Sequence, residues 1–172
     1  MDFAELIRSR ESVRSYDPAR SLDREVLLRI LEAGRLAPSA ANRQPWRFIV
    51  VESPQILDRV RGCYHREWFQ KAPCVLVVAG SRELAWKRAS DGYCSIETDL
   101  AIAMDHMILA AGNEGVGACW IAAFDPPVLR KALNLPPETC LFAITPLGYP
   151  EAGHERKGVK SRKLMDEVVT FM

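Results

Sequence analysis

Two short runs near the ends of the chain carry cations at a spacing that suits an anion. They are Arg10, Ser12 and Arg14 in "RSRESVRSY", and Lys160 and Arg162 in "KSRK". In extended backbone, residues two apart project to the same side, so each run can converge on one anion. Planar guanidinium groups match phosphate oxygens, and a phosphate monoester carries about −1.5 to −2 charges at neutral pH. The pattern indicates a phosphate clamp, but solvated surface cations share this spacing, and nothing in it brings the two ends of the chain together.

The common catalytic motifs are missing from the sequence. It contains no G-x-S-x-G, no H-E-x-x-H and no P-loop. The glycines of "GNEGVGACW" follow an expected helix and precede an expected strand, which is the wrong order for a dinucleotide-binding turn. His106 falls on an apolar helical pattern, which favours a core or interface role, while His65 and His154 have no partners at ligand spacing. We therefore expect no metal site.

Bulk composition describes an ordinary globular domain. A chain of 172 residues is predicted to form a single domain over residues 1–172, since domains average roughly 150 residues. Its net charge of +1 offers no global field for nucleic acid or an anionic membrane. The five cysteines are odd in number and form no CxxC pair, which favours buried thiols in a reducing compartment. With no signal-peptide pattern and no long apolar run, we expect a cytoplasmic protein that does not span a membrane.

Hydrophobic periodicity predicts the elements that must position the cations. Helical and strand patterns alternate along the chain, which favours an α/β or α+β domain with a central sheet. Ser21 and Asp125 are placed to cap helices, and the pattern after Cys94 predicts a long central helix that is apolar around most of its circumference. We expect helices over 3–10, 21–34, 53–62, 94–114 and 126–135, and strands over 47–52, 74–80, 117–124 and 140–149.

The connection "LAPSAANRQPW" over residues 36–46 is unusually polar for a link between two core elements. It carries Ser39, Asn42, Arg43 and Gln44, and Trp46 closes it before an apolar strand. By itself it predicts a helix-ending loop with a hydrophobic anchor. The density of hydrogen-bonding side chains also suits contact with a ligand.

Taken together, these segments resemble the FMN-dependent nitroreductase family. The resemblance rests on "IRSRESVRSYDP", "APSAANRQPWRFIVV", "LAAGNEGVGACWIAAFD", "LGYP" and "KSRK", which keep the family's order. It covers nearly the whole chain and leaves about residues 62–95 without a match. It implies an α+β nitroreductase-type FMN fold with a central, mostly antiparallel sheet flanked by helices. It also implies an intertwined homodimer with FMN at the subunit interface.

The resemblance implies roles for three groups of residues. The phosphate of FMN would be held by Arg10, Ser12, Arg14, Lys160 and Arg162. The flavin would be reached, in part from the partner subunit, by Pro38, Ser39, Asn42 and Gln44. The isoalloxazine ring would lie along Trp120, Ile121, Ala122 and Ala123. A backbone N–H at or near Ala122 would face flavin N5, where a donor suits the charge that develops on reduction.

The chemistry implied is transfer of hydride from NADH or NADPH to FMN and then to an electron-poor small molecule such as a nitroaromatic or a quinone. The flavin carries the reaction, so no catalytic side chain is expected. Two alternatives stay open: a deiodinase-like or flavin-consuming branch of the same fold, and a flavin-binding redox sensor without substantial turnover. The position of six further residues also stays open. They either line the open face of the flavin or fill the core or the dimer interface: Tyr64, His65, Trp68, Phe69, Trp86 and Tyr93.

Overall fold

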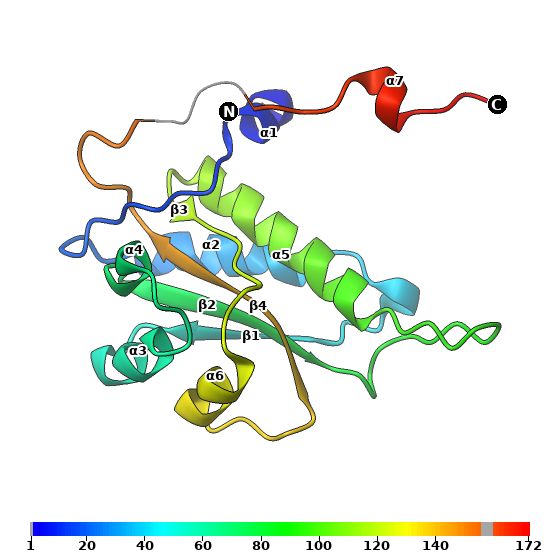
Figure 1. The fold of residues 1–172 in the computed structure, drawn as a ribbon, viewed down its shortest axis with the longest axis horizontal. Coiled ribbons are helices and arrows are strands. Elements are labelled where there is room, and N and C mark those ends of the chain that lie inside the picture. Colours follow the sequence, from blue (N-terminus) through cyan, green and yellow to red (C-terminus); the bar gives the residue numbers. More distant parts are fainter. Residues whose placement is uncertain (1, 156–159) are drawn as a thin grey trace.

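The computed structural model describes residues 2–155 and 160–172 and shows a four-stranded sheet between two layers of helices (Figure 1). The strand order is β1-β2-β4-β3, and each of these three pairings is antiparallel. The predicted antiparallel sheet flanked by helices is therefore confirmed. The strands are β1 (Trp46–Val51), β2 (Cys74–Ser81), β3 (Gly117–Ala118) and β4 (Thr139–Gly148).

Strand β2 lies in the middle of the sheet and connects two hydrophobic cores. Its residues from Cys74 to Gly80 are all buried, as a continuous apolar run with helices on both sides requires. Because successive side chains of a strand point to opposite faces, Leu76 and Val78 enter one core while Val75 and Val77 enter the other.

The helices divide between the two faces of the sheet. On one face α2 (Arg24–Arg35) packs along α5 (Ile96–Asn113), and on the other α3 (Pro54–Arg61) packs beside α6 (Pro126–Leu133). The approach of α2 to α5 is close at Gly34, where an added Cβ would lie 2.6 Å from Cγ and Sδ of Met107. The short helices are α1 (Phe3–Ser9), α4 (Glu67–Gln70), α7 (Met165–Val168) and the 3₁₀ turn η1 (Ala40–Asn42).

Two local predictions are wrong. The second helix begins at Arg24 rather than after Ser21, because the Asp23 carboxylate accepts the N–H of Glu25 and provides the cap. The strand expected over 117–124 forms a ladder only at Gly117–Ala118, and beyond it a single bridge joins Ile121 to Ile144. Asp125, by contrast, caps α6 as predicted by accepting the N–H of Val128 at 3.1 Å.

The two ends of the described chain expose apolar side chains. Phe3 on α1 is 68% exposed, and α1 buries none of its residues. Near α1 the C-terminal segment leaves the body of the protein, and α7 projects away from it (Figure 1). Exposed along this C-terminal arm are Leu164, Met165, Val168, Phe171 and Met172. Monomeric proteins seldom leave such a series of apolar side chains in water.

Within the described ranges, no helix is both long enough and apolar enough to cross a bilayer.

Candidate functional site

The segment that carries Arg10, Ser12 and Arg14 runs extended beside strand β3. The N–H of Val13 donates to the carbonyl of Ala118 at 3.0 Å, and the Val13 side chain is buried. Val13 is packed so closely that a Cβ on Gly117 would lie 2.8 Å from its Cγ1. Since side chains alternate along an extended segment, burial of Val13 sends Ser12 and Arg14 to the opposite side.

The two ends of the chain meet at this segment. Nζ of Lys160 donates to the carbonyl of Ile7 at 2.6 Å, in the last turn of α1. Loss of water contact lowers the pKa of Lys160, and the positive charges of Arg10 and Arg162 lower it further, against a smaller opposing effect of Glu11. The structure thus brings Arg10, Lys160 and Arg162 together from both ends of one chain. Their spacing in the sequence did not show whether the two ends meet.

Cys119 links the remaining members of the predicted clamp. Its thiol is buried, and burial raises its pKa, while the positive charge of Arg14, the neighbouring Ser12 and the charge of Arg10 act in the opposite direction. The backbone N–H of Cys119 donates to Oγ1 of the fully buried Thr145 at 3.1 Å. Sequence reasoning treated Cys119 only as one of five buried thiols. The one feature of the sequence that could have indicated a role at the site was the position of Cys119 between β3 and the predicted ring loop.

We refer to Arg10, Ser12, Arg14, Lys160 and Arg162 as the cation clamp. Besides the loss of water contact, the positive charges of Arg10 and Arg162 lower the pKa of Lys160, and a bound dianion would offset this repulsion. Arginine forks and a serine hydroxyl are also the donors that phosphate oxygens accept from. The residues present therefore fit the phosphate of FMN.

The predicted ring loop is only partly available to a ligand. The side chain of Ile121 is buried, and its N–H and C=O both bond to Ile144, at 2.9 and 3.0 Å. Ile121 therefore anchors the loop, and neither its side chain nor its backbone N–H is free to contact a flavin. Ala122 and Ala123 are exposed beyond it, and Trp120 is 36% exposed with its ring edge-on to Phe142.

Segment 38–44 is a strained turn whose polar groups bond to one another. Ala41, Asn42 and Gln44 have φ of 50°, 53° and 48°, in the left-handed region that non-glycine residues seldom occupy. Oγ of Ser39 accepts the N–H of Gln44 at 2.9 Å, and Nε2 of Gln44 donates to Oδ1 of Asn42 at 3.0 Å. Strain of this kind gathers at functional sites, where the surrounding structure must hold it in place.

The cation clamp and segment 38–44 lie at opposite ends of α5. The N–H of Ala40 donates to Oδ1 of Asp99 in the first turn of the helix, at 2.8 Å. A Cβ on Gly112, in the last turn, would lie 3.6 Å from Cγ of Arg10. With a rise of 1.5 Å per residue, Asp99 and Gly112 are about 20 Å apart along the helix axis. One chain does not bring the two predicted parts of the site together.

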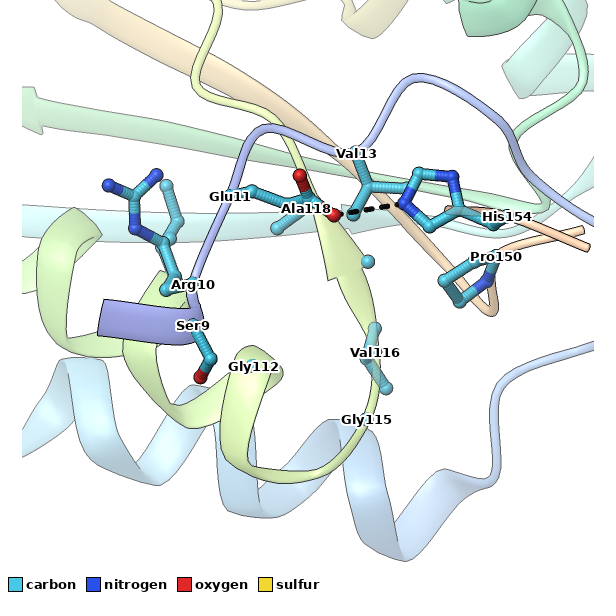
Figure 2. A pocket seen from close by; sticks show the side chains of 12 residues that line it. Ser9, Arg10, Glu11, Val13, Gly112, Gly115, Val116, Ala118, Pro150 and His154 are labelled. Atoms are coloured by element: carbon cyan, nitrogen blue, oxygen red, sulfur yellow. Dashed lines mark hydrogen bonds and ion pairs between the residues drawn. The ribbon is translucent and has the colours of Figure 1, made fainter. Parts of the chain in front are cut away.

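A small cavity of about 90 Å³ lies beside the clamp, between the end of α1, the end of α5 and strand β3 (Figure 2). At its edge the Glu11 carboxylate faces His154, whose Nε2 lies 3.0 Å from Oε1 of Glu11. The Arg10 side chain points away from this pair. At roughly 30 Å³ per water molecule, the cavity has room for a few waters and not for a flavin.

The aromatic side chains that sequence reasoning left unassigned separate into two groups. Tyr64, Trp68 and Phe69 pack against one another, and Trp68 also contacts Tyr16, so these three belong to a packed cluster. His65 is exposed. Trp86 and Tyr93, in contrast, line a groove that also includes Pro38 and Ser39.

Metal coordination finds no support in the part of the chain that the structure describes. There, no three His, Cys, Asp or Glu side chains lie close enough together to hold an ion. The five cysteines are free thiols, of which Cys63, Cys74 and Cys119 are buried. Burial raises the pKa of Cys63 to about 11 and that of Cys74 to about 12, so both stay protonated at neutral pH.

Comparison with known proteins gives consistent matches over most of the chain. The model of the nitroreductase family matches residues 7–62 and 59–149. A protein of Methanothermobacter thermautotrophicus, provisionally named NADH dehydrogenase/NAD(P)H nitroreductase, is 30% identical over 87% of this chain and 78% of its own length. A protein of the same provisional name from Archaeoglobus fulgidus is 31% identical over 85% of this chain and 84% of its own. The 5,6-dimethylbenzimidazole synthase of Rhodospirillum rubrum is 30% identical, covering 92% and 89%.

Solved structures match the whole fold. A nitroreductase family protein of Clostridium difficile 630 superposes with a TM-score of 0.87 at 29% identity, covering 99% of this chain and 98% of its own. A provisionally named nitroreductase of Desulfovibrio desulfuricans, solved in complex with FMN, gives a TM-score of 0.81 at 27% identity, covering 98% and 95%.

Proposed function

Because this chain belongs to the nitroreductase family, we propose that it is an FMN-dependent enzyme that passes hydride from NADH or NADPH, through FMN, to an electron-poor acceptor. Nitroaromatics and quinones are the acceptor classes that we favour. At the coarser level, the relatives establish a nitroreductase-like oxidoreductase. The observation that carries the proposal is the cation clamp, in which the contact of Lys160 with Ile7 brings cations from both ends of the chain together.

The clamp is proposed to hold the phosphate of FMN. Arg10 and Arg162 would face phosphate oxygens together with Lys160, and Ser12 and Arg14 would add donors from the extended segment. Charge-assisted hydrogen bonds of this type are roughly twice as strong as neutral ones. The packing of Val13 against Gly117 and the bond from Val13 to Ala118 fix the backbone from which Ser12 and Arg14 project.

The ring of the same flavin is proposed to meet segment 38–44 of a second copy of the chain. Pro38, Ser39, Asn42 and Gln44 lie about 20 Å from the clamp along α5, too far to contact a ring whose phosphate is held by the clamp of their own chain. Exposed apolar side chains on α1 and the C-terminal arm give that second copy a surface to cover. We therefore propose an intertwined homodimer with two equivalent FMN sites, each subunit being a single domain.

The protein's own contribution is to bind, orient and shield. FMN, when bound, supplies the hydride chemistry. Ala122, exposed next to the anchored Ile121, would offer its backbone N–H to flavin N5, and no protein side chain needs to donate or accept a proton. We place the enzyme in the cytoplasm, where five free thiols remain reduced.

Purification and anaerobic reduction test this proposal. We expect a yellow dimer that carries FMN and is bleached within seconds by excess NADH or NADPH, and reoxidised by an added quinone or nitroaromatic. A colourless protein that takes up no added FMN would refute it. A flavoprotein that neither nicotinamide bleaches would instead indicate a redox sensor.

A second candidate is favoured by two relatives of different activity. Besides the synthase already described, the iodotyrosine deiodinase of Thermotoga neapolitana is 26% identical over 86% of this chain. If this chain belonged to a flavin-consuming branch, FMN would disappear as the reaction proceeds. Steady turnover of a quinone with the FMN content unchanged, measured by absorbance and chromatography, separates the reductase from that branch. Release of iodide from an iodotyrosine would identify the deiodinase.

A further inference from the structure

The extended segment that carries the N-terminal half of the cation clamp has a second face. Side chains alternate along an extended backbone, so Glu11 and Ser15 project to the side on which Val13 is buried and away from the clamp. Groups on this face bond to residues 149–154, the stretch that follows β4 and continues toward Lys160. The back of the clamp segment is therefore covered by the part of the chain that leads to the C-terminal cations.

Two contacts begin an antiparallel run between these stretches. The N–H of Asp17 donates to the carbonyl of Tyr149 at 2.9 Å. The hydroxyl of Ser15 donates to Oε2 of Glu151 at 2.7 Å. Residue numbers fall along the first stretch as they rise along the second, so each further contact lies nearer to both ends of the chain. The run therefore leads toward the clamp.

The pair of Glu11 and His154 continues this run beside the clamp (Figure 2). Nε2 of His154 lies 3.0 Å from Oε1 of Glu11, and because a carboxylate only accepts, His154 is the donor. The two side chains are only 18% and 16% exposed, so water competes less for this bond than for the bonds of a surface ion pair. Glu11 stands between Arg10 and Ser12 in the sequence, so the bond ties the clamp segment itself to the C-terminal stretch.

Glu11 also acts on the C-terminal half of the clamp. Its negative charge raises the pKa of Lys160, against the loss of water contact and the charges of Arg10 and Arg162, which lower it. Lys160 is held to α1 by its own bond, and His154 lies only a short way before it in the chain. A short covalent connection keeps the local concentration of a linked group high. A fixed His154 therefore keeps Lys160 and Arg162 near Arg10.

We propose that Glu11 and His154 are positioning residues for the phosphate of FMN, whose bond holds the C-terminal half of the clamp in place without touching the phosphate. This inference rests on the proposed function, because it needs the phosphate of FMN in the clamp. The bond increases the fraction of molecules in which the clamp is assembled before the flavin arrives, and the apparent affinity scales with that fraction. The pair supports the phosphate site alone, so affinity for the flavin ring should not depend on it.

Two flavins separate the phosphate from the ring. Protein freed of its flavin is titrated with FMN and with riboflavin, which lacks the phosphate, and flavin fluorescence gives both dissociation constants. The ratio of the two constants is the FMN preference, and it reports the clamp because the ring contacts are common to both ligands. We expect His154→Ala to lower this preference about fivefold through loss of one hydrogen bond. His154→Gln keeps an amide that can donate to Glu11 and should restore most of it.

Substitution of Glu11 also changes the charge beside the clamp, so two variants are compared with each other. Glu11→Gln and Glu11→Ala lose the same negative charge, but only glutamine keeps an oxygen that accepts from His154. We expect the FMN preference of Glu11→Ala to be about fivefold below that of Glu11→Gln. Glu138→Ala is the matched control, at an exposed residue just before β4 and at the far end of this strand from Tyr149. It should leave the preference within about twofold of wild type, because the lost charge is distant and screened.

A double variant shows whether the two residues act through one bond. In the Glu11→Ala background, His154→Ala should lower the FMN preference no further. An additional loss would show that His154 contacts the phosphate itself and would overturn the positioning role. An equal FMN preference in the alanine and glutamine variants at both positions would overturn it as well. So would a parallel loss of riboflavin affinity, since the substitutions would then disturb the whole flavin site.

Failure of the proposed function is recognised in the wild-type protein. A wild-type protein that binds FMN no more tightly than riboflavin has no phosphate site, which would overturn the proposed clamp and this inference with it. A clear FMN preference in wild type that the variants do not change would overturn the inference alone.

Discussion

The cation clamp and segment 38–44 lie at opposite ends of α5 and differ in what their polar groups contact. In the clamp, loss of water contact and the positive charges of Arg10 and Arg162 lower the pKa of Lys160. In segment 38–44, Ser39, Asn42 and Gln44 bond to one another in a strained turn. The first region gathers its cations from both ends of one chain. The second is closed on itself and fixed to α5 through Asp99, and we propose that it meets the flavin held by a second copy of the chain.

Removal of the C-terminal arm should have the largest effect of the changes considered, because it would weaken the proposed dimer in which the clamp of one subunit meets segment 38–44 of the other. Truncation after Lys163 keeps the whole clamp and deletes Leu164, Met165, Val168 and Phe171, all of them exposed. Each such side chain contributes about 1.5–3 kcal/mol when fully buried, so we expect the dimer dissociation constant to rise at least a hundredfold. Analytical ultracentrifugation at several concentrations measures this change. A truncated protein that remains as dimeric as wild type would show that the arm does not hold the second copy.

Asp99→Ala should be the most destabilising single substitution near segment 38–44. It leaves the N–H of Ala40 without its acceptor and frees the hydroxyl of Ser95, at a side chain 1% exposed. We expect a loss of about 3 kcal/mol in the free energy of unfolding, measured with urea. Asp99→Asn can accept from Ala40 and donate to Ser95, and should lose about 1 kcal/mol. Equal losses in the two variants would indicate that the hydrogen bonds do not fix the segment.

Substitution in the clamp should weaken FMN binding without a comparable loss of stability. Arg14→Ala or Arg162→Ala would remove one of the charge-assisted hydrogen bonds that we propose to the phosphate, and we expect the FMN dissociation constant to rise roughly tenfold or more. Fluorescence titration measures it, and added salt should weaken wild-type binding as well. Arg82→Ala is the control, since Arg82 is exposed and pairs with Glu97 in the first turn of α5, at the other end of the helix from the clamp. Unchanged FMN affinity in both clamp variants would show that the clamp does not bind the phosphate of FMN.

The smallest effect is expected from relief of strain in the turn. Asn42→Gly suits φ of 53° but loses the Oδ1 that accepts from Gln44. The two effects oppose each other, and we expect the free energy of unfolding to change by less than about 1 kcal/mol. FMN reoxidation by a quinone should slow more clearly, if Asn42 contacts the ring. Thermal unfolding measures the change in stability, and stopped-flow absorbance measures the rate of FMN reoxidation.

The sequence was sufficient for elements whose pattern is local. The buried run of β2, the long apolar α5 and the Asp125 cap follow from periodicity and capping chemistry. The start of α2 was misplaced because Ser21 and Asp23 are both good caps, and only the observed bond to Glu25 decides between them. The family resemblance added the antiparallel sheet, which periodicity alone left open.

The site was harder to predict than the fold, since its contacts are not local. Spacing indicated Arg10, Ser12 and Arg14, yet the approach of Lys160 to Ile7 joins residues from the two ends of the chain. Cys119 was missed because a thiol in an apolar strand gives no sign of the arginines beside it. Ile121 was included in the ring loop although its backbone is paired with Ile144, because a single bridge leaves no periodic pattern in the sequence.

The bond between Lys160 and Ile7 also sets the order in which the molecule is completed during its synthesis. Domains begin to fold from the N-terminus while the ribosome is still extending the chain. Arg10, Ser12 and Arg14 are made well before Lys160 and Arg162, since Lys160 lies 153 residues after its partner Ile7. In the proposed FMN site the clamp is completed only when this later segment has been made, so a chain truncated before Lys160 is expected to retain flavin poorly.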